Sequence, residues 1–70
     1  KRGMRIDAVT KGKPAEKAGM QKGDIITAID GKKVGNIYDY MNRLQALEAG
    51  KTISVDIIRD GKEMVLIVQL

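Results

Sequence analysis

Apolar and polar side chains alternate in two stretches of the chain and predict strands there. Residues 4–9 read Met-Arg-Ile-Asp-Ala-Val, and residues 53–57 read Ile-Ser-Val-Asp-Ile. A period of two residues is typical of a strand that buries one face. Residues 25–29 form a third, more continuously apolar strand.

Short turn signals connect these strands. Asp30-Gly31 is a favoured two-residue turn, so we expect residues 32–34 to return as a short strand. Residues 59–62, Arg-Asp-Gly-Lys, turn the chain into residues 64–68, which predicts a β-hairpin with residues 53–57. Residues 64–68 are apolar on both faces, which is typical of a central or covered strand.

Two helices complete the predicted fold. Pro14 suits a first helical turn, and Gly19 ends this short helix while Met20 folds back onto it. Asn36 is a candidate N-cap of a longer helix that ends near residues 49–50. Its apolar side chains have helical spacing; they are Ile37, Tyr40, Met41, Leu44 and Leu47. We therefore expect one α+β domain over residues 1–70, a small, partly closed, mostly antiparallel sheet or barrel capped by one short and one long helix.

The composition argues against a self-contained enzyme. The chain of 70 residues contains neither cysteine nor histidine. It therefore lacks the thiolate, the commonest metal ligand and the usual general base near neutral pH. We expect no catalytic residue, no metal site and no cofactor in this fragment. No apolar run approaches the roughly 20 residues that span a bilayer, so we expect no membrane insertion by it.

Three chemical interpretations of polar residues do not fit the sequence. Gly50-Lys51-Thr52 resembles the end of a phosphate-binding loop, but Gln45 occupies the position of its first glycine and a strand follows. Asp24 and Asp30 are separated by an apolar run, which does not suit one tight calcium site. Ser54 has no histidine to activate it. The glycines of residues 19–31 are therefore interpreted as turn residues.

The charge is unevenly distributed along the chain. The net charge is +4, and residues 1–35 carry nine Lys/Arg against four Asp/Glu. A basic half attracts nucleic acid, anionic lipid or a carboxylate ligand, although a solvated lysine surface is the plainer interpretation. Tyr38 and Tyr40 are the only aromatic residues and lie in the less basic half, which disfavours base stacking.

Residues 13–31, KPAEKAGMQKGDIITAIDG, resemble the bacterial PDZ-domain pattern small/polar-Pro-Ala-x-x-Ala-Gly-apolar-x-x-Gly-Asp-x-Ile-x-x-Ile-Asp/Asn-Gly. The resemblance extends over essentially the whole chain. Such domains belong to trypsin-like, tail-specific and intramembrane proteases and to zinc aminopeptidases. The segment NIYDYMNRLQALEAGK looks most like the aminopeptidase kind. The resemblance implies a module excised from a larger bacterial protease that acts outside the cytoplasm, with the catalytic domain in cis.

The resemblance also implies a binding mode. The family binds an extended peptide, often a free C-terminus, as a strand added between a sheet edge and the second helix. Gly3 and Met4 match the end of the N–H loop that holds the terminal carboxylate. The implied edge strand continues with Arg5, Ile6, Asp7 and Ala8, and the facing helix contributes Tyr40, Met41, Arg43 and Leu44.

Some details of this site stay open at the level of sequence. Apolar residues on both walls favour an apolar terminal side chain in the ligand, and Lys1, Arg2 and Arg5 favour its negative charge. Asp39 and Arg43 form either an ion pair or the groove rim. We expect a peptide or a protein C-terminus as partner, and no nucleic acid. The alternatives are a structural domain whose groove is filled or hardly used, and a basic nucleic-acid-binding domain.

Overall fold

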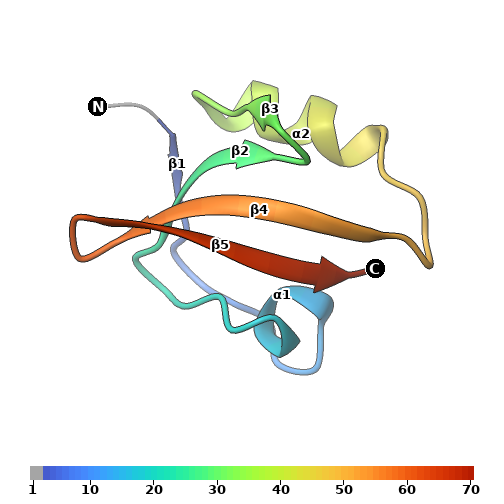
Figure 1. Cartoon of the computed structure of the whole chain (residues 1–70), viewed down its shortest axis with the longest axis horizontal. Helices are drawn as coiled ribbons and strands as arrows, with labels where there is room; N and C mark the ends of the chain where they lie inside the picture. The colour runs from blue at the N-terminus through green and yellow to red at the C-terminus, as the bar shows by residue number, and fades with distance from the viewer. Residues whose placement is uncertain (1–2) are drawn as a thin grey trace.

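One antiparallel sheet organises the protein, and the computed structural model describes residues 3–70 of it. The predictions for Lys1 and Arg2 lie outside the described residues. The elements are β1 (Met4–Arg5), α1 (Pro14–Lys17), β2 (Ile25–Ile29), β3 (Lys32–Lys33), α2 (Ile37–Gln45), β4 (Thr52–Arg59) and β5 (Lys62–Gln69). The strand order is β1-β2-β4-β5, and β3 pairs with β2 (Figure 1). The predicted α+β fold with one short and one longer helix is confirmed.

β2 lies inside the sheet and supplies much of the core. It pairs with β1, β3 and β4, and its register against β4 shifts between Ile26 and Ala28. This bulge lets Ile26 and Ile29, which are three residues apart, both reach the core. The predicted turn follows at Asp30 and Gly31, whose φ angles of 52° and 82° are those of a tight hairpin turn.

β4 and β5 form the predicted hairpin, but one prediction about it is wrong. The strands pair in register from Arg59↔Lys62 to Thr52↔Gln69 around the Asp60–Gly61 turn. β5 is an edge strand and not a central or covered one, because the strand order ends with it. Its outward side chains Val65 and Ile67 are each 60% exposed.

The first predicted strand is shorter than residues 4–9. Regular pairing of β1 with β2 covers Met4 and Arg5. Ile6 still exchanges backbone hydrogen bonds with Asp24 and Gly23, both of 2.8 Å. Residues 21–24 then form a turn, closed by a 3.1 Å bond from Asp24 N–H to Gln21 C=O. The chain beyond Ile6 therefore has no partner strand, so Asp7 and Ala8 lie outside any strand.

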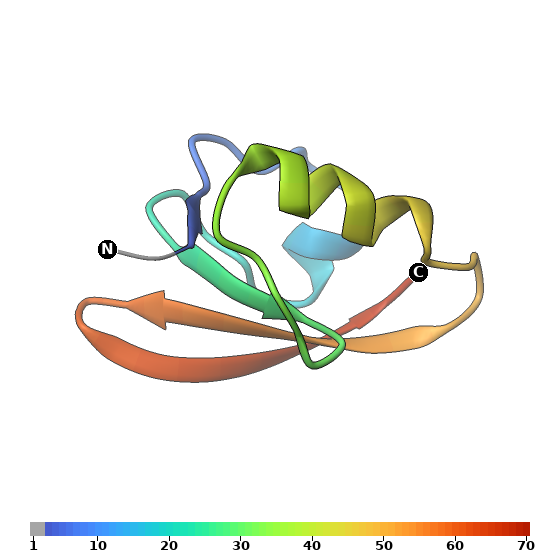
Figure 2. The same cartoon turned by 90° about the horizontal axis from the view of Figure 1, so that it is seen from above.

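Both helices lie on the same face of the sheet (Figure 2). α1 ends as predicted, with Gly19 at a φ of 97° and a 3.0 Å bond from Met20 N–H back to Ala15 C=O. α2 ends at Gln45 and not near residues 49–50. Its last predicted turn is lost because Gly50 N–H donates to Leu70 C=O over 3.0 Å, which ties that segment to the end of the sheet.

The hydrophobic core lies between the sheet and the two helices. Its buried side chains come mainly from β2, β4 and the segments that flank β2 and β3; they are Ile6, Met20, Ile26, Ile29, Val34, Ile53, Val55, Ile57 and Val68. Neither helix contributes a buried residue. The helices are therefore attached to the core by partly buried side chains.

Candidate functional site

α2 presents an apolar stripe that the rest of the domain covers only in part. Asn36 caps the helix by accepting a 2.9 Å hydrogen bond from Asp39 N–H, as predicted. Tyr40 and Leu47 pack against the core. Ile37, Met41 and Leu44 remain 49%, 51% and 39% exposed. An amphipathic helix normally buries such a stripe, so this one has apolar surface available for a ligand.

A cavity of about 220 Å³ opens between α1, α2 and the inner face of the sheet. We call it the interhelical cavity. It is lined by Lys13, Pro14, Ala15, Met20, Ile26, Ile29, Tyr40, Leu44, Leu47, Ile53, Val55, Val68 and Leu70. All of these except Lys13 are apolar or weakly polar side chains. An engineered apolar cavity of about 150 Å³ holds benzene, so this space is large enough for an apolar side chain.

β1 offers one edge to a further strand. The N–H and C=O of Ile6 point toward residues 23–24 on the β2 side. Because backbone groups alternate along an antiparallel strand, those of Arg5 point to the opposite edge. No described strand pairs with that edge.

Gly3 is required at the start of β1 by its contact with β2. Its φ is +113°, and a Cβ built on it would lie 2.6 Å from Ile25 Cγ2 and 2.7 Å from the Ile26 carbonyl oxygen. Only glycine allows this approach and this backbone angle. The close approach is thus to β2, and the role of Gly3 and Met4 in holding a carboxylate stays a prediction.

Some of the predicted site residues line the interhelical cavity, and others lie in β1 or directly after it. Tyr40 and Leu44 line the interhelical cavity. Met4 packs against the core and Ile6 is buried in it, whereas Arg5, Asp7 and Ala8 are exposed around β1.

The remaining polar residues of α2 have local roles. Asp39 Oδ2 accepts a 3.0 Å bond from Gly35 N–H, and Arg43 Nε donates to Lys33 C=O over 3.3 Å. The two side chains therefore anchor α2 to the β3 connection. Within residues 3–70 they form no ion pair with each other.

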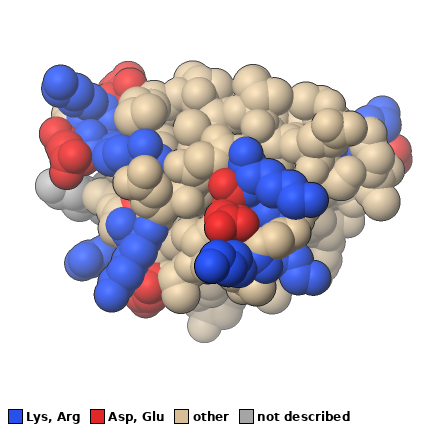
Figure 3. Space-filling view, turned by 90° about the horizontal axis from the view of Figure 1, so that it is seen from below, with Lys and Arg blue, Asp and Glu red and all other residues tan. Residues whose placement is uncertain are grey.

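Charged side chains are mixed on the face that is seen from below in Figure 3. Lys and Arg groups lie beside Asp and Glu groups there, and an uncharged region lies between the clusters. Within residues 3–70 no cluster of three or more potential metal-ligating side chains occurs. No helix in the same residues is long and apolar enough to cross a membrane.

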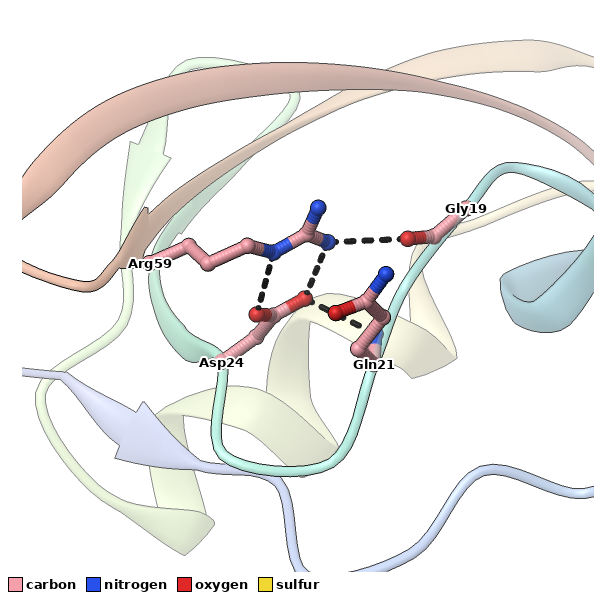
Figure 4. Close-up of polar contacts among 4 residues, drawn as sticks. All are labelled: Gly19, Gln21, Asp24 and Arg59. Carbon is pink, nitrogen blue, oxygen red and sulfur yellow. Dashed lines mark hydrogen bonds and ion pairs between the residues drawn. The ribbon is translucent and has the colours of Figure 1, made fainter.

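An ion pair that sequence reasoning missed fastens the turn before β2 to the end of β4 (Figure 4). Asp24 is 1% exposed and accepts bonds of 2.8 Å from Arg59 Nε, Arg59 Nη2 and Gln21 N–H. Arg59 Nη2 also donates to Gly19 C=O over 2.8 Å. The hydrogen bond from Arg59 holds the pKa of Asp24 below its ordinary value, although burial opposes this effect.

Sequence and structure comparisons agree on the family. The PDZ-domain family model matches residues 1–70. A probable periplasmic serine protease, do/HhoA-like, of Haemophilus influenzae is 40% identical over 60 residues, which are 86% of this chain and 13% of that protein. A putative zinc metalloprotease of Mesorhizobium japonicum is 45% identical over 59 residues, 84% of this chain and 16% of that protein.

A solved structure agrees with these sequence matches. The HtrA-type protease AlgW with decapeptide superposes with a TM-score of 0.88 at 26% identity, over 93% of this chain and 20% of that one. The chain thus spans only a small part of the proteases that it resembles. It belongs to the PDZ-domain family.

Proposed function

We propose that this domain binds an extended peptide between β1 and α2, with an apolar peptide side chain in the interhelical cavity. The cavity is the observation that carries the proposal, because it is apolar, open and flanked by the exposed stripe of α2. The free edge of β1 supplies the N–H and C=O of Arg5 for main-chain pairing. The related protease AlgW was solved with a decapeptide, which supports a peptide as the class of ligand.

Binding of a decapeptide with an apolar C-terminal residue tests this proposal. Leu44→Lys places a charge at the cavity and should weaken binding at least about tenfold, because an apolar contact is replaced by a desolvated ammonium group. Tyr38→Lys is the matched control, since Tyr38 is 76% exposed on the same helix and does not line the cavity. Nuclear magnetic resonance shifts should follow β1 and α2 together and leave the Asp60–Gly61 turn unchanged.

The outcomes of this titration separate the alternatives. Equal affinity of wild type and Leu44→Lys would refute the cavity as the binding site. No binding of any peptide would favour the structural-domain interpretation. Shifts confined to exposed lysines and lost in moderate salt would indicate nonspecific electrostatic binding.

Capture of the peptide carboxylate is a separate part of the proposal. Gly3 and Met4, with the basic side chain of Arg5, are the residues that we propose to be nearest the peptide C-terminus. Amidating the peptide removes a charge-assisted hydrogen bond and should weaken binding by roughly 1.5 to 3 kcal/mol. Equal affinity of acid and amide would leave strand addition intact and refute carboxylate capture.

We further propose that the domain serves a larger protease outside the cytoplasm, with the catalytic domain in the same chain. The periplasmic serine protease relative supports a trypsin-like parent, and the metalloprotease relative supports a zinc enzyme as the alternative. Neither relative is an aminopeptidase, so the aminopeptidase resemblance has no support from them. A serine-directed inhibitor and a zinc chelator applied to the full-length protein distinguish the two catalytic classes.

A further inference from the structure

The edge of β5 carries backbone groups without a strand partner. In a hairpin closed by the two-residue turn Asp60–Gly61, the flanking residues Arg59 and Lys62 are a hydrogen-bonded pair. Every second residue of β5 from Lys62 onward therefore bonds to β4. The intervening residues Glu63, Val65, Ile67 and Gln69 direct their N–H and C=O groups to the outer edge. Among the strands of residues 3–70, β5 pairs only with β4.

The side chains of the same residues make this edge apolar. Val65 and Ile67 are each 60% exposed and lie side by side on the outer face of the sheet. β5 contains no proline, and its charged residues Lys62 and Glu63 both lie at the hairpin end. Long, apolar edges of this kind favour pairing with another strand. Figure 3 shows the uncharged region on the face that includes this edge.

We propose that β5 pairs with β5 of a second copy of this chain, antiparallel and about a twofold axis at Leu66. This register places Val65 opposite Ile67 of the second copy and Glu63 opposite its Gln69. These are the residues whose backbone groups point outward, so each opposing pair exchanges its N–H···O bonds. No like charges face each other in this arrangement.

A charge on α1 is complementary to one on β5 of the second copy, which favours a second copy as the partner of the β5 edge. A hollow of about 520 Å³ beside β5 is lined by Lys17 of α1 together with Ile67 and Gln69. Because Glu63 of the second copy lies opposite Gln69, its carboxylate comes to the hollow that Lys17 lines. The twofold axis repeats this Lys17–Glu63 pair on the other side.

This interface is separate from the proposed peptide groove. β1 and β5 are the two ends of the strand order, so a dimer through β5 leaves the β1 edge free. Peptide binding and dimerisation are therefore independently testable.

Sedimentation analysis of the 70-residue chain from about 10 µM to about 1 mM tests the dimer. We expect a concentration-dependent dimer that Ile67→Lys weakens at least about tenfold. Tyr38→Lys adds the same charge at another exposed apolar position and should leave the equilibrium unchanged. A chain that stays monomeric throughout, or a dimer that resists Ile67→Lys, would overturn the proposal.

A charge swap tests the register. Lys17→Glu and Glu63→Lys should each weaken the dimer, because each creates a like-charge pair, and the double variant should restore it. Both positions are exposed, so circular dichroism should show folded protein for all three variants. Failure of the double variant to recover the dimer would refute this register. Nuclear Overhauser contacts between Val65 of one copy and Ile67 of the other, measured in a mixed-label sample, provide a direct check of the register.

Discussion

Asp24 couples the stability of the domain to pH through its bonds to Arg59. Its pKa in the folded protein is below the ordinary value of about 3.9 that it has when unfolded. A carboxylate of this kind stabilises the fold above the unfolded pKa, and the contribution is lost as the pH falls through the folded pKa. The domain should therefore lose stability below about pH 4.

Replacing Asp24 with asparagine should remove this contribution. We expect Asp24→Asn to lower the free energy of unfolding by about 1 to 3 kcal/mol at neutral pH. This is less than for a fully buried pair, because the Arg59 side chain is 22% exposed. Urea unfolding measures the change, and Asp30→Asn, in an exposed turn, is the control.

The effect of Asp24→Asn should depend on pH. The gap in stability between wild type and Asp24→Asn should narrow below about pH 4, where the wild type also becomes protonated. A gap that stays constant down to about pH 2 would contradict the assignment of the acid transition to Asp24.

Gly3 has other atoms close to the position of a Cβ and Gly31 has none. Substitution by alanine should therefore lower the free energy of unfolding by different amounts at the two positions. Gly31 has a φ of +82° and no atom within 4 Å of a built Cβ, so Gly31→Ala should cost about 1 kcal/mol of backbone strain. Gly3→Ala adds a clash with β2 and should cost about 2 to 4 kcal/mol. Equal losses in urea unfolding would show that the contact of Gly3 with β2 is unimportant for stability.

The roles of residues that act on near neighbours could be predicted from the sequence. The role of Asp24, whose partner Arg59 is distant in sequence, could not. The Asn36 cap and the ends at Gly19 and Gly31 follow from side-chain and backbone preferences within a few residues. Asp24 and Arg59 are 35 residues apart, and each lies in a segment that already reads as a turn. Nothing local distinguishes a buried ion pair from two solvated turn residues.

At the scale of elements, α2 should be less stable than the strands β2 and β4. It has no buried residue, whereas β2 and β4 supply most of the core. Amide hydrogens of α2 should exchange faster than those of β4. Asn36→Ala should speed exchange in α2 further and cost about 0.5 to 2 kcal/mol of helix stability, while β4 changes little. Peptide binding should slow exchange in α2, and protection of α2 equal to that of β4 would contradict this ranking.

The element boundaries that were predicted wrongly are those set by contacts with segments distant in sequence. The strand predicted from alternation extended to Val9, but β1 ends where β2 has no further residues to pair. Helical spacing extended to Leu47 and the helix was predicted to end near residues 49–50, but Gly50 is bound to Leu70 instead. β5 was interpreted as covered because both faces are apolar, and only the strand order reveals it as an edge.

At the scale of the whole molecule, the interhelical cavity predicts how peptide affinity responds to temperature and salt. Burial of apolar surface should give a negative heat-capacity change in calorimetry at several temperatures. Affinity should change less than about threefold between about 50 mM and about 300 mM salt, since most of the contact is apolar. A steep loss of affinity with salt would instead place binding on the lysine surface.

The overall fold was predictable because hydrophobic period and turn chemistry agree along the chain. The cavity was not, because it depends on how far α1 and α2 stand from the sheet. The spacing of Tyr40 and Leu44 predicted that they share one face of α2, and both line the cavity. It did not distinguish residues that line a cavity from residues that fill a core.

The contact between Asp24 and Arg59 also fixes how β2 and β4 align. β2 is apolar on both faces, so its hydrophobic pattern alone specifies its register against β4 only weakly. Asp24 directly precedes β2, and Arg59 is the last residue of β4. A one-residue slip of β2 along β4 would separate the two side chains and leave the buried Asp24 carboxylate without its guanidinium partner, which is strongly destabilising. The ion pair thereby favours the one alignment in which Ile25 lies opposite Ile58.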